Sequence, residues 1–195
     1  MQLFRRLLLG WMLSMSMVVY CQAQVFTASP NQLCNEGTFM GFTQAVSGLS
    51  PASNSAFGFY EVCVTLNHPL ASDVTLAIQS PAGSYLQLVN ANGGNANFTS
   101  ACFRLYATHS IRYSAAPFNG AYMAYNNLRD LINGQNPNGT WTLYYTDNVV
   151  NGIKGTLVSW SISFQTNPEM LALNNASSNI PIFKIDVPSG YIPDQ

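Results

Sequence analysis

The sequence predicts an all-β sandwich, and three of its features carry that prediction. Short runs such as residues 57–66, 74–78 and 155–164 alternate apolar and polar side chains, which is the period of half-buried strands. Gly, Pro, Asn and Asp mark turns about every ten residues between these runs. Helical spacing is confined to one short segment, which is too little helix to cover a parallel sheet.

The composition indicates a neutral, polar surface around an apolar core. Charged residues make up 8% of the 195 residues, against roughly 25% in an average soluble protein. The formal net charge is -1 at pH 7, so neither nucleic acid nor an anionic membrane is an expected partner. A chain of this length fits one domain with a substantial core.

Residues 1–23 have the pattern of a signal peptide. Arg5 and Arg6 precede an apolar run, and small residues at Cys21 and Ala23 mark a cleavage site. A transmembrane anchor is the alternative, but the run is shorter than the ~20 residues that span a bilayer. We therefore expect a secreted or cell-surface protein with no membrane span after cleavage, which begins with an N-terminal segment at residues 24–35.

Two strands are predicted after the N-terminal segment, and the second of them enters a hairpin. Residues 57–66 and 74–78 are predicted to send one face inward, which holds Tyr60, Val62, Val64, Leu66, Val74, Leu76 and Ile78. In the next turn Pro81 presets φ and Gly83 permits a positive φ. These residues predict a hairpin that leads into a further strand at 84–89.

Two irregular segments come next. Residues 90–98 hold too many Gly and Asn for a regular element, so they are predicted to form an exposed loop. In the segment 125–132, Leu128, Leu131 and Ile132 stand three and four apart behind two asparagines that can cap a helix. This spacing predicts one or two helical turns.

Two tryptophan-bearing runs complete the predicted sandwich. Residues 140–147 place Trp141, Leu143 and Tyr145 on one side. The run 155–164 is predicted to send Val158, Trp160, Ile162 and Phe164 inward and Leu157 outward. Each indole buries on the order of 200 Å², so both tryptophans are interpreted as core residues rather than ligand-stacking ones.

Three cysteines remain after the predicted cleavage. Cys63 and Cys102 each border a strand-like run, so they are the predicted disulfide, and Cys34 is left free or partnered elsewhere. No C-x-x-C spacing occurs. Zinc and thioredoxin chemistry are therefore not expected.

The motifs SPAG, PFNG, NGTW and GTLVSWSI follow one another in the region 36–165. This order resembles the P domain (P/Homo B domain), the non-catalytic domain of kexin- and furin-like serine proteases, in the form found in secreted bacterial proteins. The resemblance implies a jelly-roll, galactose-binding-like sandwich. Residues 166–195 lose the alternation and are interpreted as a polar tail or the start of an incomplete module. The resemblance assigns structural roles to His68, Pro81, Gly83, Gly120, Gly139, Trp141, Gly155 and Trp160.

A catalytic site is not expected. A Ser/His/Asp triad needs a histidine between a nucleophile and a carboxylate, and neither His68 nor His109 accompanies a G-x-S-x-G motif. His68 lies in a predicted turn close in sequence to Asp73, and it is interpreted as a turn residue bonded to the backbone. Acids stand singly, without the paired carboxylates of glycosidases. The resemblance implies association with a serine protease domain, which this sequence does not contain.

Calcium is the one cofactor hypothesis. Asp73 and Asp147 each lie at a predicted loop–strand junction among Asn residues, and calcium takes oxygen ligands of this kind. The alternative is that both aspartates cap turns. Residues 148–154 carry no acid where members of the resembled family usually have one, which weakens the calcium hypothesis.

Two function hypotheses remain open. The resemblance implies a secreted, non-catalytic module accessory to proteolysis, which stabilises or positions a subtilisin-like serine endopeptidase or another surface partner. The alternative is a stand-alone adhesion or carbohydrate-binding module of a bacterial surface. Its candidate ligand is a glycan, bound by the predicted surface tyrosines Tyr122, Tyr125 and Tyr144.

Overall fold

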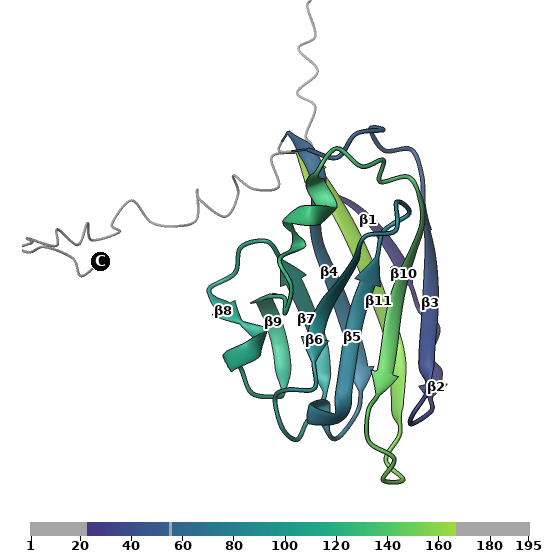
Figure 1. Cartoon of the computed structure of the whole chain (residues 1–195), viewed down its shortest axis with the longest axis vertical. Coiled ribbons are helices and arrows are strands. Elements are labelled where there is room, and N and C mark those ends of the chain that lie inside the picture. The colour runs from purple at the N-terminus through teal and green to yellow at the C-terminus, as the bar shows by residue number, and fades with distance from the viewer. Residues whose placement is uncertain (1–22, 55, 167–195) are drawn as a thin grey trace, which may run out of the picture.

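Two antiparallel-rich sheets face each other in the computed structural model, which describes residues 23–54 and 56–166 (Figure 1). The larger sheet has the order β1-β11-β4-β7-β9-β8, with β2 also paired to β11, and the smaller has the order β3-β10-β5-β6. The all-β prediction is therefore confirmed. The larger sheet contains β1 (Gln24–Ala28), β2 (Gln32–Cys34), β4 (Phe57–Asn67), β7 (Phe98–Arg104), β8 (His109–Ser110), β9 (Phe118–Met123) and β11 (Gly155–Thr166). The smaller contains β3 (Phe39–Val46), β5 (Val74–Gln79), β6 (Tyr85–Asn90) and β10 (Gly139–Asp147).

The core lies between the two sheets and is closed by the two tryptophan-bearing strands. Trp141 on β10 and Trp160 on β11 are each 1% exposed. The ring centroids of Trp141 and Phe164 are 5.6 Å apart in an edge-to-face arrangement, which joins the smaller sheet to the larger one. The interpretation of both indoles as core residues is confirmed.

Two register shifts change which side chains face that core. Tyr60 was predicted to point inward, but the pairing of β4 with β11 shifts between Ser163 and Phe164, and Phe59 takes the buried position instead. A second shift lies between Leu157 and Ser159, so Leu157 is buried rather than Val158. An extra residue in one strand reverses the alternation beyond it, which is why period two alone placed both residues wrongly.

The N-terminal segment supplies strands to the larger sheet. β1 and β2 both pair with β11, and Gln24 lies opposite Phe164. Thus the start of β1 and the end of β11 are side by side at one end of the sandwich (Figure 1). The predicted signal peptide, except for its last residue, and the tail beyond Thr166 lie outside the described residues. Within the described part of the chain, no helix has the length and apolar character needed to cross a membrane.

The connections follow the predicted turn chemistry. Gly83 has φ of 92° in the hairpin between β5 and β6. Three 3-10 helices interrupt the strands: η1 (Ala71–Asp73), η2 (Ile111–Tyr113) and η3 (Leu128–Ile132). η3 is the predicted helical turn, and the side chain of Asn127 caps it by accepting a bond from the Arg129 N–H at 3.0 Å.

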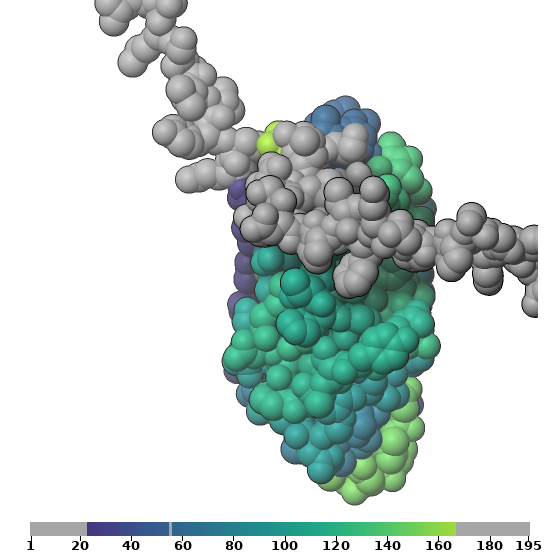
Figure 2. Space-filling model, turned by 90° about the vertical axis from the view of Figure 1, so that its left-hand side faces the viewer, coloured from purple at the N-terminus to yellow at the C-terminus, as the bar shows by residue number. Residues whose placement is uncertain are grey.

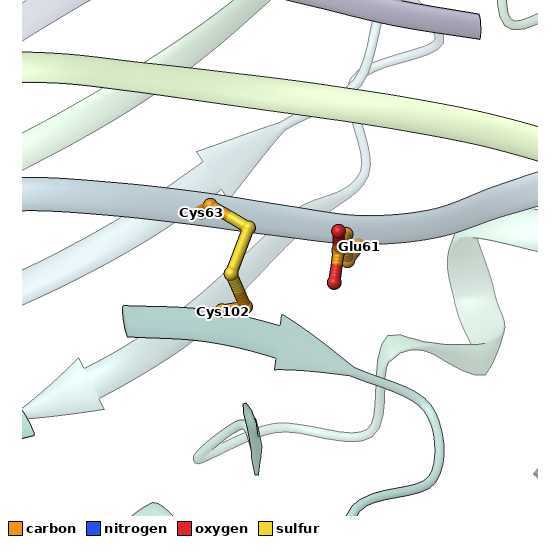
Figure 3. Close-up of side chains that lie close together, drawn as sticks. All are labelled: Glu61, Cys63 and Cys102. Atoms are coloured by element: carbon orange, nitrogen blue, oxygen red, sulfur yellow. A yellow bond between two sulfur atoms is a disulfide. The ribbon is translucent and has the colours of Figure 1, made fainter. Parts of the chain in front are cut away.

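The predicted disulfide between Cys63 and Cys102 is confirmed. The two cysteines lie directly opposite each other on β4 and β7, with Cα atoms 3.9 Å apart, and Glu61 lies two residues before Cys63 on β4 (Figure 3). Cys34 is a free, fully buried thiol. Burial raises its pKa above the ordinary value.

Candidate functional site

A buried, hydrogen-bonded histidine–aspartate pair lies at one end of the sandwich. His68 follows β4, and Asp147 is the last residue of β10. The His68 Nε2 atom is 3.1 Å from Asp147 Oδ2, and both side chains are 0% exposed. The neighbouring Leu70 N–H donates to His68 Nδ1 at 3.2 Å. The partner of His68 is therefore Asp147, 79 residues away, rather than the nearby Asp73.

These hydrogen bonds determine which nitrogen of the His68 ring carries the proton. Because Nδ1 accepts a backbone N–H, it carries no proton, and Nε2 is the nitrogen that donates to Asp147. In a catalytic triad one ring nitrogen faces the carboxylate and the other faces the nucleophile. Here both nitrogens are engaged, so His68 has none left to activate a hydroxyl. Its interpretation as a turn residue bonded to the backbone holds, with a buried acid as the second partner.

Gly155 is needed where β11 passes this ring. A Cβ on Gly155 would lie 2.7 Å from His68 Cδ2. No real Cβ approaches that closely, so any larger residue would push the imidazole away from Asp147. The structural role implied for Gly155 thus has a specific cause, which is room for His68.

The loop 148–154 follows Asp147 directly and is held by two acids, Asp73 and Glu36. Asp73 receives a bond from Asn151 Nδ2 at 2.9 Å, and its backbone oxygen receives two bonds from Asn148. Glu36 Oε1 accepts from the N–H groups of Asn151 and Ile153 at 2.9 and 2.8 Å. The loop lacks an acid of its own, and Glu36, 115 residues before Asn151, supplies one. Nothing in the local sequence signalled this residue.

Asp73 and Asp147 act here as acceptors of protein hydrogen bonds. Ser72 donates to Asp73 Oδ1 at 3.2 Å, and the Val149 N–H donates to Asp147 Oδ1 at 3.1 Å. These contacts are those of the turn-capping alternative. Calcium binding by the two aspartates stays a prediction. Among the described residues, the group with metal-ligand spacing is Glu61, Cys63 and Cys102 (Figure 3), and there the disulfide takes both sulfurs.

The remaining motif residues shape turns and core. Gly139, the first residue of β10, has φ of 136°, and a Cβ there would lie 2.7 Å from the Pro81 side chain. The start of β10 therefore packs closely against the turn that contains Pro81. Trp141 Nε1 donates to the Pro137 carbonyl at 2.8 Å, which satisfies the buried indole. Gly120 has φ of 100° on the exposed part of β9. Each is a backbone or packing role rather than a ligand-binding one.

The predicted tyrosine surface is only partly correct. Tyr122 is 9% exposed, and its hydroxyl bonds to the backbone of Asn119, so it belongs to the core rather than to the surface. Tyr122 lies on β9 facing Phe118, a contact that the sequence pattern did not reveal. Tyr125 is half-buried beneath the Arg112 guanidinium. Tyr144 is half-buried on the outer face of the smaller sheet.

Tyr144 is the centre of an aromatic strip formed with Phe39 and Tyr85. Its ring stacks on Phe39 at 4.5 Å and lies 5.7 Å from Tyr85. Phe39 and Tyr85 are 62% and 43% exposed. The four strands of this sheet carry one charged side chain, Asp147, which is fully buried. Their outer face is therefore aromatic and uncharged.

A second surface feature is a pocket of about 480 Å³ at the β8 edge of the larger sheet. Its lining includes Arg104, Arg112 and Arg129 together with Tyr106 and Tyr125, and we call it the arginine pocket. Figure 2 views the molecule from this side, where these segments are teal to green. The sequence pattern did not find this pocket, because its arginines come from three separate elements.

The described residues thus form a β-sandwich module whose one buried histidine is committed to structural bonds. The family model of the proprotein convertase P-domain matches residues 59–164, and the chain belongs to this family. It is a family of non-catalytic domains associated with serine proteases.

Two solved structures are similar to the chain. One is a serine protease of Aeromonas sobria, with 17% identity and a TM-score of 0.43, and the other is the complex of that protease with a chaperone, with 16% identity and a TM-score of 0.44. Each match covers 74% of this chain and 26% of the other. At these values neither structure constrains the function of this chain. No curated protein matches it.

Proposed function

We propose that this chain is a secreted, non-catalytic module that docks on and positions a subtilisin-like serine protease or another surface protein. The observation that carries the proposal is the family match over residues 59–164. The engagement of both His68 ring nitrogens supports the non-catalytic part, since it leaves no general base at the buried pair. The disulfide supports export, because such bonds persist in oxidising compartments.

Docking of this kind needs a rigid surface and no cofactor. A stable complex buries roughly 800 Å² on each partner, and a two-sheet sandwich provides such a surface with little ordering cost. Long hydrogen-bonded ladders join β4 to β11 and β10 to β3. They hold the backbone in place beneath the side chains that would contact the partner. The module therefore contributes affinity and placement, while the partner contributes the chemistry.

The test is capture of partners from the native culture medium by the immobilised full secreted chain. Captured proteins are labelled with a fluorophosphonate probe, which reacts with the active serine of serine hydrolases, and are identified by mass spectrometry. Enrichment of a labelled protease over a control bead supports the proposal. Labelling of the purified chain itself would contradict its non-catalytic character, and capture of no protein would contradict docking.

A second candidate function is binding of an uncharged polysaccharide. The observation that favours it is the aromatic strip on a sheet face without exposed charge, because flat aromatic rings pack against sugar rings while neighbouring amides and hydroxyls bond to their hydroxyl groups. Tyr144→Ala removes the central ring and is expected to abolish retention on insoluble neutral polysaccharides. Tyr113→Ala, at a 91% exposed tyrosine outside the strip, is the matched control. Equal retention of both variants would reject this function.

A further inference from the structure

One edge of the smaller sheet is free along a strand of eight residues. β3 stands first in the strand order β3-β10-β5-β6 and, among the described strands, pairs with β10 alone. Residues of an antiparallel pair alternate in direction, so half of those on an edge strand turn their N–H and C=O groups away from the sheet. β3 therefore presents a row of backbone donors and acceptors on the right-hand side of the molecule in Figure 1.

The other sheet edges of the described residues are closed or shorter. β6, at the opposite edge of the same sheet, is closed by the segment that follows β9. The Tyr125 N–H donates to the Leu88 carbonyl at 2.9 Å, and Asn126 donates to the Gln87 carbonyl at 2.9 Å and accepts the Gln87 N–H at 2.7 Å. In the larger sheet, β8 is two residues long, β2 three and β1 five. The β3 edge is thus the longest free edge of the described strands.

β3 lacks the features that usually protect an edge from pairing. Proteins block exposed edges with Pro, with charged side chains, with bulges or with very short strands. The sequence of β3, FMGFTQAV, contains no Pro and no charge, and its pairs with β10 run from Phe39 to Val46 without a register shift. One carbonyl, that of Ala45, is covered by the side chain of Gln44 at 2.9 Å. An edge of this length and regularity is suited to pairing with another strand.

The chemistry of the β3 edge identifies what can cover it. A row of backbone donors and acceptors at strand spacing is matched by another extended backbone, as in recognition by strand addition. Phe39 is 62% exposed on the outer side of β3, and Met40 is half-buried on the inner side against the core. β-branched side chains pair well with an aromatic one across strands, whereas a charged side chain beside Met40 would lose its water. The matching segment is therefore uncharged and rich in β-branched residues.

We infer that the β3 edge is the docking site for an extended, uncharged segment of the partner protein, which adds to the smaller sheet as a strand beside β3. The inference rests on the proposed function, since it assigns a site to the docking that the function requires. The added strand needs no rearrangement of the sandwich, because β10 already fixes the position of β3 along its whole length. Main-chain hydrogen bonds supply the affinity, and the side chains beside Phe39 and Met40 supply the selectivity.

The first test is fluorescence anisotropy with the full secreted chain. The probe is a fluorescein-labelled peptide in which Thr and Val alternate between neutral Ser-Gly ends. Its matched control has the same side chains but a methyl group on every amide nitrogen of the repeat, so it cannot donate to a neighbouring strand. We expect the probe to bind in the micromolar to millimolar range, and the control to bind far more weakly. Equal binding of the two peptides, or no binding of the probe at millimolar concentration, overturns the inference.

Hydrogen exchange shows where the probe binds. Amides that point outward from an unpaired edge exchange readily, and pairing protects them. With the probe at about ten times its Kd, exchange of these amides in the segment 39–46 should slow about tenfold. The segment 85–90, which contains β6, should be unchanged. Protection of another strand in place of β3 would overturn the inference.

Two lysine variants of β3 provide a matched comparison. Met40→Lys puts an ammonium group on the inner side of the strand, where it reaches water while the edge is free but is buried when a strand is added. It should weaken the probe about tenfold or more. Thr43→Lys adds the same charge on the exposed outer side, which an added strand leaves in water, so the native affinity should be retained. Thermal melting checks that both variants fold, and equal affinities would overturn the inference. If Met40→Lys does not fold, the exchange measurement on the native chain decides.

Other occupants of the β3 edge would give different results. If the native chain sediments as a dimer and Met40→Lys as a monomer, the edge pairs with a second copy and the inference is wrong. If the probe binds only after residues 167–195 are removed, the chain's own C-terminal segment covers the edge, and the inference is again wrong.

Capture from culture medium separates this inference from the function on which it rests. If Met40→Lys captures a labelled protease as the native chain does, docking stands and this site for it is rejected. Failure of the native chain to capture any protein counts against the proposed function, while the exchange measurement still decides whether the β3 edge accepts a strand.

Discussion

Two side-chain pairs of the described structure, His68 with Asp147 and Arg104 with Glu61, differ in how far water reaches them. The first lies at the closed end of the sandwich and the second at its open edge. His68 and Asp147 are both fully buried, and each ring nitrogen of His68 has a fixed partner. Arg104 and Glu61 are 34% and 18% exposed, and they lie beside a pocket open to solvent. A buried charge depends on its partner because water cannot replace it. An exposed one exchanges partners at little cost. The closed end therefore contributes strongly to the stability of the fold, whereas the exposed pair at the open edge contributes little.

The largest effect is expected at the closed end. His68→Ala leaves the Asp147 carboxylate buried without its partner, and it should lower the free energy of unfolding by about 3–5 kcal/mol. Urea titration followed by tryptophan fluorescence measures the loss, since both core indoles report on unfolding. The double variant His68→Ala/Asp147→Asn removes the stranded charge and should recover part of it. A loss below about 1 kcal/mol, the value typical of an exposed pair, would show that burial does not make Asp147 depend on His68.

The second-largest effect is expected from the disulfide between Cys63 and Cys102, which joins β4 to β7 in the larger sheet. Cys63→Ser/Cys102→Ser removes a bridge between residues 39 apart in sequence, which should cost about 2–4 kcal/mol through the unfolded chain. Thermal melting of the variant and of the native chain, with and without reductant, measures this cost. The variant should be insensitive to reductant. If reductant destabilised it as much as the native chain, another covalent link would have to be responsible.

A smaller effect is expected at alkaline pH, where ionisation of Tyr145, two residues before Asp147 on β10, should lower the free energy of unfolding. Burial, with a further contribution from Asp147, raises the pKa of Tyr145 above its ordinary value of 10.0. The unfolded phenol ionises near 10 while the folded one stays protonated, so the unfolded state loses protons first and stability falls as pH rises above about 10. Between pH 9 and 11 the native chain should lose about 1 kcal/mol more than Tyr145→Phe. Urea titrations at both pH values test this, and equal losses would exclude the phenol as the cause.

The smallest effect is expected for the exposed pair. Arg104→Gln breaks the bond to Glu61 between neighbouring strands and should lower stability by less than about 1 kcal/mol. High salt should narrow the difference between the variant and the native chain, because it screens exposed pairs. Urea titration at low and high salt provides the measurement. A loss as large as that of His68→Ala would remove the distinction between the two ends.

Local pattern predicted much of the fold. Alternation placed the strands that carry Trp141 and Trp160, and turn chemistry placed Gly83 and the cap at Asn127. It failed at Tyr60 and Val158, where a single extra residue shifts the register and no local residue type marks the shift. Tyr122 was also misplaced, because the sequence predicted no strand at 118–123 and so gave no inward face on which Tyr122 meets Phe118.

The candidate sites were harder to predict than the fold. His68 was recognised as a structural turn residue, but its partner Asp147 is 79 residues away and becomes a neighbour only when the two sheets pack. Glu36 reaches the loop 148–154 in the same way. The arginine pocket forms only where β7, η2 and η3 meet, and the spacing of its arginines follows no helical or strand period. Sites made by long-range packing leave little trace in a single sequence.

The pairing of Gln24 with Phe164 fixes how this module is tethered. The described chain enters the sandwich at β1 and leaves it at β11 at the same end. The loop 148–154 and the His68 turn lie at the opposite end. A protein fused directly before Gln24 or directly after Thr166 would thus start at this end of the sandwich, away from the loop 148–154. A short linker from Thr166 to Gln24 would equally permit circular permutation.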